Sequence, residues 1–336
     1  MKRSSLIKAI AAFFLSGGIM AYCSMAPLPP IPAGAFNEEN YSMETENVIT
    51  LPDGRTLGYA DYGDANGFPV FYFHGGQESR LSSRFMDSTA TKLHVRIIAP
   101  DRPGIGLSTF HENRKFLDWA NDVKALADHL GFNNFSIFGL SGGAPHVLAC
   151  AYVLRNRVVN VGIVSGTGPY NYKGKLKGMW FPVRLAHWFA AAKSDKNLRA
   201  FISTEHETLL ENPEKRLRQL QRFLPKPDRK LLLGTPAYGV EFIQGSREAF
   251  RQGTEAVVQE WKLYVADWGF PLEEVANNIN LWYGTDDKMT PKHRGIYYHE
   301  TLQDSELHIL EKEGHFSLIR NHLEAILADL APQTVP

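Results

Sequence analysis

The stretch FSIFGLSGGAPHVLACAYVL, residues 135–154, constrains the fold more than any other part of the chain. An apolar run of strand length leads into a short turn in which glycines flank Ser141, and an apolar segment of helical length follows. A strand and a helix that are both apolar, and are joined by so short a turn, must both be buried. This arrangement is typical of a parallel sheet covered by helices on both faces.

Short β-branched or aromatic runs recur along the chain and alternate with helical patterns. Besides residues 135–140, strands are expected near Val48 and Tyr59 and over residues 70–73, 95–99, 159–164, 279–283 and 307–310. A helical period runs over residues 116–131, where Gly131 is placed to end the helix. The pattern predicts an α/β fold with a mostly parallel eight-stranded sheet flanked by helices.

Strand signals stop after the sixth predicted strand. Residues 181–193, 212–224 and 246–269 are helical in pattern, and Pro213 suits a first helical turn. An insertion of this size is too long for a simple loop. We therefore predict a helical cap over residues 170–275, inserted between strands 6 and 7 and covering the carboxyl edge of the sheet. The α/β core would then comprise residues 44–169 and 276–330.

The N-terminus has the features of a targeting segment. Residues 1–26 begin with basic side chains and continue into an apolar run, which predicts a signal peptide or an N-terminal anchor. Cys23 offers a lipid-attachment site, and Ser24-Met25-Ala26 offers small residues for cleavage. Residues 27–43 read as a Pro-rich linker. We expect an exported or cell-envelope protein, as a cleaved signal peptide, a lipoprotein or an N-terminal anchor would give; this segment is the one candidate for membrane attachment.

Composition excludes several classes of function. Lys plus Arg and Asp plus Glu both number 36, so no net charge attracts nucleic acid. The two cysteines, Cys23 and Cys150, form neither a disulfide framework nor a zinc motif. Cys150 lies in an apolar stretch and is expected to be a small buried residue.

Ser141 is the candidate nucleophile. In a strand-turn-helix of this kind the serine is exposed on a strained turn, and the backbone N–H of Gly142 can face an oxyanion. A serine needs a histidine base and an orienting carboxylate, in the order Ser, Asp or Glu, His. Asp286 and Asp287 follow the penultimate strand, and His315 follows the last one.

Five motifs together resemble the α/β-hydrolase superfamily: VFYFHGG, APDRPGIGLS, GLSGG, WYGTDDKMTP and GHFS. The resemblance covers roughly residues 41–330 and implies the α/β-hydrolase fold. It implies Asp287 as the triad acid, with Asp286 the alternative, and the N–H of Gly76 as the second oxyanion donor. HGGQES lacks the proline of related loops, so the Gln77 side chain competes with Gly76 for that role.

Other residues in these motifs have simpler structural explanations. His74 is expected to fix its loop by hydrogen bonding, and Arg102 to form an ion pair within a turn. His146 is expected to pack within its helix. The aromatic run Trp180, Phe181, Trp188 and Phe189 suits packing within the cap, or an apolar acyl pocket.

These residues predict a serine hydrolase that cleaves a carboxylic ester, lactone or amide of a small, apolar molecule through an acyl-enzyme. Ser141, His315 and Asp287 form the triad, Gly76 and Gly142 form the oxyanion hole, and no cofactor or metal is needed. Two alternatives remain. One is a non-catalytic ligand-binding protein of the same fold. The other is an acyltransferase or carbon-carbon bond hydrolase that uses the same triad.

Overall fold

Eight strands form one sheet in the computed structural model, which describes residues 30–31, 35–36 and 47–331. The strands are β1 (Asn47–Thr50), β2 (Thr56–Gly63), β3 (Phe68–Phe73), β4 (Val95–Pro100), β5 (Phe135–Leu140), β6 (Val158–Val164), β7 (Ile279–Gly284) and β8 (Ser305–Leu310). Their order across the sheet is β1-β2-β4-β3-β5-β6-β7-β8. β2 pairs antiparallel with both of its neighbours, β1 and β4, and the other five pairings are parallel. The predicted eight-stranded, mostly parallel sheet is confirmed.

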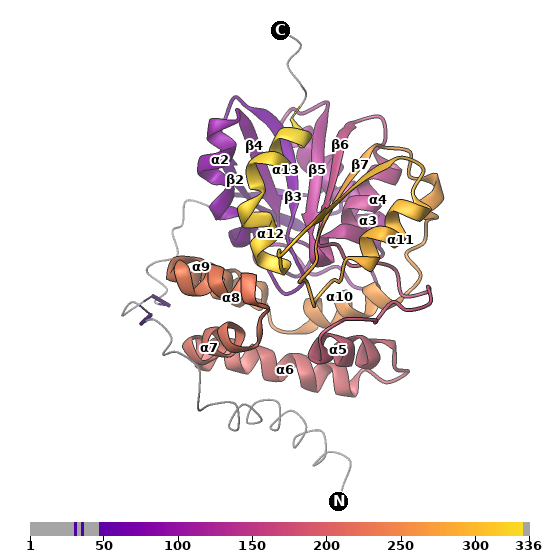
Figure 1. The fold of residues 1–336 in the computed structure, drawn as a ribbon. Coiled ribbons are helices and arrows are strands. Elements are labelled where there is room, and N and C mark those ends of the chain that lie inside the picture. The colour runs from indigo at the N-terminus through magenta and orange to yellow at the C-terminus, as the bar shows by residue number, and fades with distance from the viewer. Residues whose placement is uncertain (1–29, 32–34, 37–46, 332–336) are drawn as a thin grey trace, which may run out of the picture. The chain divides into compact units, whose positions relative to one another are not determined.

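Side chains of the central strands are buried on both faces of the sheet, as the continuous apolar runs require. Along β3, Phe71 and Phe73 enter one apolar cluster, whereas Val70 and Tyr72 enter the other. Helices cover both faces (Figure 1): η3 (Arg80–Met86), α2 (Asp87–Lys92), α3 (Phe116–His129), α4 (Ala144–Val153), α11 (His293–Thr301), α12 (His315–Asn321) and α13 (Leu323–Leu330).

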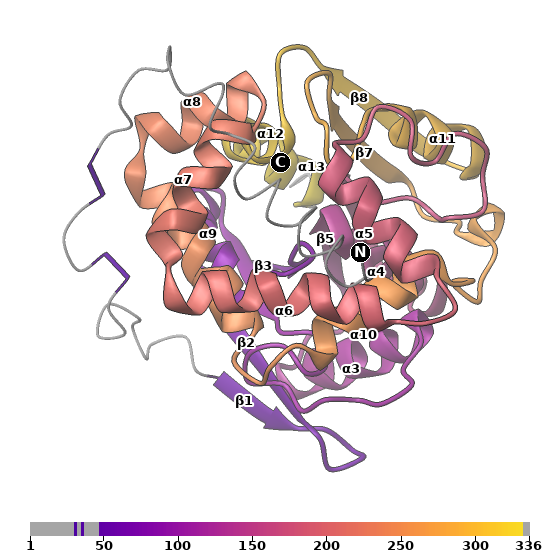
Figure 2. The same ribbon diagram turned by 90° about the horizontal axis from the view of Figure 1, so that it is seen from below.

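Six helices lie between β6 and β7 and are called the cap helices below. They are α5 (Phe181–Ala191), α6 (Lys196–Glu211), α7 (Pro213–Phe223), α8 (Lys226–Gly234), α9 (Pro236–Ala249) and α10 (Glu255–Val265), with a short turn η5 (Leu272–Glu274) after them. Figures 1 and 2 show α5–α9 gathered at one end of the sheet. α8 contacts α12 and α9 contacts η3. These contacts seat the cap helices against the core.

Two predicted helical stretches are each interrupted. The stretch 246–269 ends in α9 at Ala249 and starts again at Glu255, because Gly253 between them has a φ of +97° that breaks a helix. The FSLIRNHLEAILADL segment, residues 316–330, also has a helical pattern and is divided at His322 into α12 and α13. α3 ends as expected, since Gly131 has a φ of +75°.

The predictions for the N-terminus lie outside the described residues. These are the signal peptide or anchor over residues 1–26, with Cys23, and nearly all of the linker over residues 27–43. Within the ranges that the structure does describe, no helix combines the length and the apolar character needed to cross a membrane.

Gly143 is a position where the fold tolerates no side chain. A Cβ added there would lie 2.3 Å from the carbonyl oxygen of Phe73, which belongs to the neighbouring strand β3. We expect Gly143→Ala to lower the free energy of unfolding by about 1–3 kcal/mol, because strand or helix must shift. Urea denaturation followed by circular dichroism measures this loss.

Gly234→Ala is the matched control, since a Cβ at the end of α8 meets no atom within 4 Å. Its free energy of unfolding should stay within about 0.5 kcal/mol of the wild-type value. Equal stabilities for the two variants would contradict the close approach of β3 and the turn after β5.

Candidate active site

Ser141 lies at the carboxyl end of β5, on a single turn (η4, Ser141–Gly143) that leads into α4. Its φ of +54° is in the left-handed region that L-residues rarely adopt. The turn is tight because Gly139 and Gly143 face each other: a Cβ on Gly139 would lie 3.1 Å from the carbonyl carbon of Gly143. The sequence therefore holds a half-buried serine in a strained conformation at the edge of the sheet.

His315 and Asp287 are brought together by the loops after β8 and β7. His315 Nδ1 lies 2.8 Å from Asp287 Oδ2, and both side chains are almost completely buried. The Oδ1 atom of Asp287 accepts two backbone N–H groups, from Met289 at 2.7 Å and Thr290 at 2.9 Å. The loop that carries Asp287 thus fixes one oxygen of its carboxylate, and the other oxygen is left to orient the imidazole.

The electrostatics of this pair favour a charged Asp287 carboxylate and a His315 imidazole that readily accepts a proton, as a general base must. Burial would raise the pKa of Asp287, but His315 and the two N–H donors hold it below its ordinary value. Burial would likewise lower the pKa of His315, but the Asp287 carboxylate raises it above its ordinary value, with further contributions from Asp228 and Glu78. A charged Asp287 therefore stabilises the protonated imidazole.

Asp286, the alternative acid, is directed elsewhere. Its backbone N–H donates to the carbonyl oxygen of Glu313 at 2.9 Å, and its Oδ1 lies 3.5 Å from the hydroxyl of Thr285. Among the described hydrogen bonds none joins Asp286 to His315. The carboxylate that contacts the histidine is that of Asp287.

Neighbouring strand ends are linked by a series of hydrogen bonds. The N–H of Thr167, after β6, donates to the carbonyl oxygen of Ser141 at 2.9 Å. The hydroxyl of Thr290, after β7, lies 2.6 Å from the carbonyl oxygen of Ser165 and 2.9 Å from Asp287 Oδ2. Together with the His315–Asp287 contact, these bonds connect the loops after β5, β6, β7 and β8. Ser141, Asp287 and His315 thus lie at one edge of the sheet.

No hydrogen bond joins Ser141 to His315 in the part of the chain that the structure describes. Bonds between a nucleophile and its base are often long in a free enzyme and shorten when a substrate binds. The structure therefore places both residues at the same edge of the sheet, without a direct hydrogen bond between them.

Gly76 and Gly142 are adjacent, as an oxyanion hole requires. A Cβ built on Gly142 would lie 2.9 Å from the backbone nitrogen of Gly76 and 2.2 Å from the hydroxyl oxygen of Tyr264. The loop carrying Gly76 bends at Gln77, whose φ is +60°. Tyr264, from cap helix α10, therefore packs directly against both glycines.

A buried arginine holds the start of that loop. Arg102 donates to the carbonyl oxygens of His74 and Gly75, the second at 2.9 Å, and forms an ion pair with Glu260 of α10. The predicted Arg102 ion pair is thus present, with a partner in the cap helices. Glu260 also accepts from Arg114 at 2.8 Å and from Tyr264 at 3.1 Å.

The charge of Glu260 is maintained by its partners. Burial would raise the pKa of Glu260, but Arg102 and Arg114 lower it far below its ordinary range. The same burial lowers the pKa of His74 and of His146 well below the ordinary value, so both imidazoles are neutral. Their contacts are structural, as predicted: His74 Nδ1 lies 3.0 Å from the Gly75 carbonyl, and His146 Nδ1 lies 3.2 Å from that of Gly142.

Rings of the predicted aromatic run pack within the cap helices, as expected. Phe181 and Trp188 are exposed on α5, where their ring centroids lie 6.2 Å apart, and Phe189 contacts Phe201. A small cavity lies between α8, α9 and the core, and its lining includes the chain neighbours of Ser141 and His315, namely Leu140 and Phe316. The residues that line it include Glu78, Leu140, Leu231, Leu232, Phe242 and Phe316.

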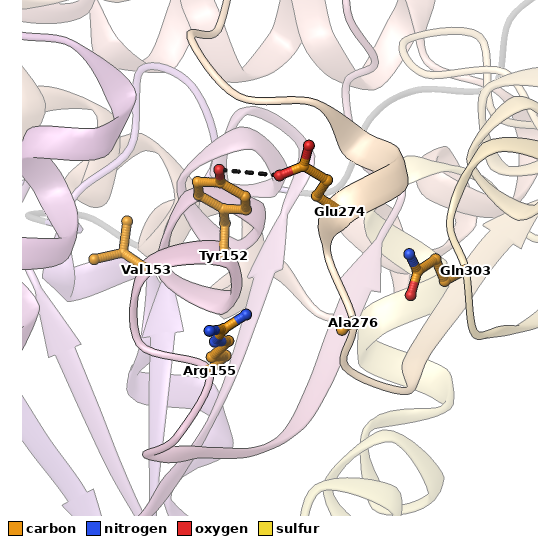
Figure 3. A pocket seen from close by; sticks show the side chains of 6 residues that line it. All are labelled: Tyr152, Val153, Arg155, Glu274, Ala276 and Gln303. Carbon is orange, nitrogen blue, oxygen red and sulfur yellow. Dashed lines mark hydrogen bonds between the residues drawn. The ribbon is translucent and has the colours of Figure 1, made fainter.

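A more open pocket lies away from these residues. Figure 3 shows it lined by Tyr152, Val153, Arg155, Glu274, Ala276 and Gln303, with the Tyr152 hydroxyl donating to Glu274 at 3.3 Å. Tyr152 and Val153 end α4, whereas Ser141 precedes its first residue, and a ten-residue helix is about 15 Å long. This pocket therefore lies at the far end of α4 from Ser141, apart from the candidate site.

Several residues around the site had no sequence signal of their own. Glu260 and Tyr264 lie in an ordinary helical pattern, and Asp228 lies in a charged helix start. Thr290 could have been inferred from its place in GTDDKMTP, three residues after the acid. Among the described residues no cluster of three or more His, Cys, Asp or Glu side chains is arranged to hold a metal ion. Cys150 is buried, and burial raises the pKa of its thiol well above the ordinary value.

Comparisons with known proteins agree with this geometry. The chain is 33% identical over 107 residues to a proline iminopeptidase of Arabidopsis thaliana and 29% identical over 162 residues to a non-heme chloroperoxidase of Streptomyces lividans. The matched stretches cover 30% and 46% of this chain, and 27% and 57% of those relatives, less than two thirds of their length.

A solved esterase from Thermogutta terrifontis superposes with a TM-score of 0.62, covering 84% of this chain and 97% of that one at 17% identity, which shows the shared fold. The α/β-hydrolase fold family matches residues 69–321. Since this match spans most of the chain and includes every residue of the candidate site, the protein belongs to the α/β-hydrolase fold family.

Proposed function

We propose that this protein is a serine hydrolase that cleaves a carboxylic ester of a small, largely apolar molecule through an acyl-enzyme. The observation that carries this proposal is the placement of a strained serine, Ser141, at the same sheet edge as a buried His315–Asp287 pair. Nucleophile, base and orienting acid are the parts that acyl transfer requires.

In the first half-reaction, Ser141 Oγ attacks the carbonyl carbon while His315 Nε2 takes the hydroxyl proton. The carbonyl oxygen becomes an oxyanion and accepts hydrogen bonds from the N–H groups of Gly76 and Gly142. When the tetrahedral intermediate collapses, the carbon-oxygen bond to the alcohol breaks, and the imidazolium gives its proton to the departing alcohol. The product is an acyl ester on Ser141.

Water then repeats the sequence. His315 takes a proton from the water, the hydroxide attacks the acyl carbonyl carbon, and the bond to Ser141 Oγ breaks as the serine regains its proton. The Nδ1–H of His315 points to Asp287 throughout, which keeps Nε2 free to accept.

The lining of the small cavity between α8, α9 and the core favours an uncharged acyl group. Its apolar surface includes Leu231 and Leu232 of α8, together with Leu140 and Phe316, which precede Ser141 and follow His315 in the chain. The names of two relatives, a proline iminopeptidase and a non-heme chloroperoxidase, suggest two alternative reactions. In the first an amide bond is cleaved in place of an ester, and in the second a peroxide accepts the acyl group in place of water. These outcomes are separated by testing a panel of esters beside a prolyl anilide as the amide substrate, each with and without hydrogen peroxide as a competing acceptor.

An alkyl fluorophosphonate should label Ser141 and no other residue. The strained elbow exposes Oγ, and His315 activates it, so the protein mass should increase by one phosphonyl group within minutes. Intact-mass analysis and peptide mapping measure this reaction, with Ser141→Ala and His315→Ala as inactive controls.

The matched control is Ser136→Ala, a buried serine on the same strand whose hydroxyl donates to the carbonyl oxygen of Leu330. It should be labelled at the wild-type rate. A folded wild-type protein that is not labelled would contradict the hydrolase mechanism and favour a ligand-binding function instead.

The pH dependence of kcat/KM should follow His315. Only the neutral imidazole accepts the proton of Ser141, so activity is lost as the pH falls through the pKa of His315. Because that pKa is raised by Asp287, the acid limb should lie above the ordinary midpoint of about 6.5 for histidine.

In Asp287→Asn the acid limb should move to lower pH, because the neighbouring negative charge is gone, and kcat should fall by about 10²–10⁴-fold. Asp286→Asn is the matched control and should keep both parameters near the wild-type values. If instead Asp286→Asn caused the larger loss, the assignment of the acid would be wrong.

A further inference from the structure

A carboxylate from the cap helices holds the backbone of the histidine loop. Asp228, in the first turn of α8, accepts the backbone N–H of His315 at 2.9 Å through Oδ2. Its Oδ1 accepts the N–H groups of Phe316 at 2.9 Å and Ser317 at 2.8 Å. The two carboxylate oxygens therefore accept the backbone N–H groups of the first three residues of α12, which begins at His315.

This contact is buried and closely fitted. Asp228 has no exposed surface, and in the described part of the chain it forms no ion pair with Lys or Arg. A Cβ on Gly314 would lie 2.5 Å from its Oδ1, so the glycine before the histidine makes room for the carboxylate. Burial raises the pKa of Asp228, whereas the N–H groups of Ser317 and His315 and the charge of His315 act in the opposite direction.

Three carboxylates act on the His315 imidazole. Asp287 contacts it directly, Asp228 reaches its backbone from α8, and Glu78 approaches from the loop after β3. Glu78 is itself buried, where it accepts the N–H of Gly75 at 3.2 Å. Asp228 is the one of the three that belongs to the cap helices.

We propose that Asp228 is a positioning residue for the catalytic base: through it, helix α8 sets the place of His315 relative to Ser141. The proposal rests on the hydrolase function proposed above. While α8 is seated on α12, the histidine backbone is held at three points. If α8 moves away, the first turn of α12 loses these acceptors, and the His315 backbone that carries the imidazole is no longer held in place.

Substrate binding would strengthen this coupling. Leu231 and Leu232 lie one turn after Asp228 on α8 and line the small cavity opposite Phe316. An acyl group in that cavity would touch α8 and α12 together. Filling the cavity therefore stabilises the seated position of α8, and with it the working position of His315.

Asp228→Asn tests this role at the histidine itself. The amide oxygen of the variant can keep the bonds to Phe316 and Ser317, but its NH2 group then faces the N–H of His315. With a reactive aryl ester as substrate, we expect kcat to fall about 10–100-fold, as for a small misplacement of a catalytic group, and KM to change by less than about threefold.

The acid limb of kcat/KM should also move to lower pH, because one of the three carboxylates has lost its charge. Glu248→Gln is the matched control, since it removes a cap carboxylate that contacts the core at Arg80, 2.7 Å away, and not the histidine loop. It should keep the wild-type kcat and pH profile. Asp228→Asn with both parameters unchanged would overturn the proposal, as would an equal loss in Glu248→Gln.

Titration of the His315 ring by NMR in the full chain separates this proposal from the hydrolase function. If the wild type reacts with no ester or fluorophosphonate, a lower His315 pKa in Asp228→Asn still supports the positioning role, and an unchanged pKa overturns it. If Asp228→Asn does not fold, Gly314→Ala displaces the same carboxylate without removing its charge. There we expect a similar fall in kcat with the acid limb nearly unchanged, and a wild-type kcat would overturn the proposal.

Discussion

The close approach of β5 and the first turn of α4 is the constraint on which the site depends. Strand and helix come together because Gly139 and Gly143 carry no side chains, and this leaves Ser141 with a positive φ. The strain of such a residue is about 1–3 kcal/mol and persists only where the surroundings enforce it. Here the enforcement comes from β3, whose Phe73 carbonyl packs against Gly143, and from Thr167, which binds the carbonyl of Ser141.

The other parts of the site are arranged around that turn by parallel strands. Loops after β3, β7 and β8 emerge at the same edge as Ser141, so they bring Gly76, Asp287 and His315 toward it. The cap helices then complete the site from two sides. α10 supplies Glu260 and Tyr264 to the oxyanion loop, and α8 supplies Asp228 to the histidine loop. The cap helices therefore contribute to the geometry of the reacting groups as well as covering them.

Much of this could be predicted from the sequence, because the signals are local. All eight strands coincide with predicted runs, and the order of motifs at strand ends predicts that His315 pairs with Asp286 or Asp287. The choice of Asp287 is what the resemblance to the α/β-hydrolases implies, and the structure brings Asp287 to His315. The contacts from the cap could not be predicted in the same way. Asp228 and Glu260 lie 87 and 158 residues from the groups they hold, in helices whose patterns resemble any solvated helix. Their roles depend on how α8 and α10 dock, which periodicity does not encode.

The most direct test of this account is a crystal structure of the protein after reaction with a dialkyl aryl phosphate, whose phosphoryl group resembles the tetrahedral intermediate. We predict a covalent bond from Ser141 Oγ to phosphorus. The phosphoryl oxygen should lie about 3 Å from the backbone nitrogens of both Gly76 and Gly142, and His315 Nε2 should lie next to Oγ. A phosphorus atom on another residue, or a phosphoryl oxygen directed away from both glycines, would contradict the account.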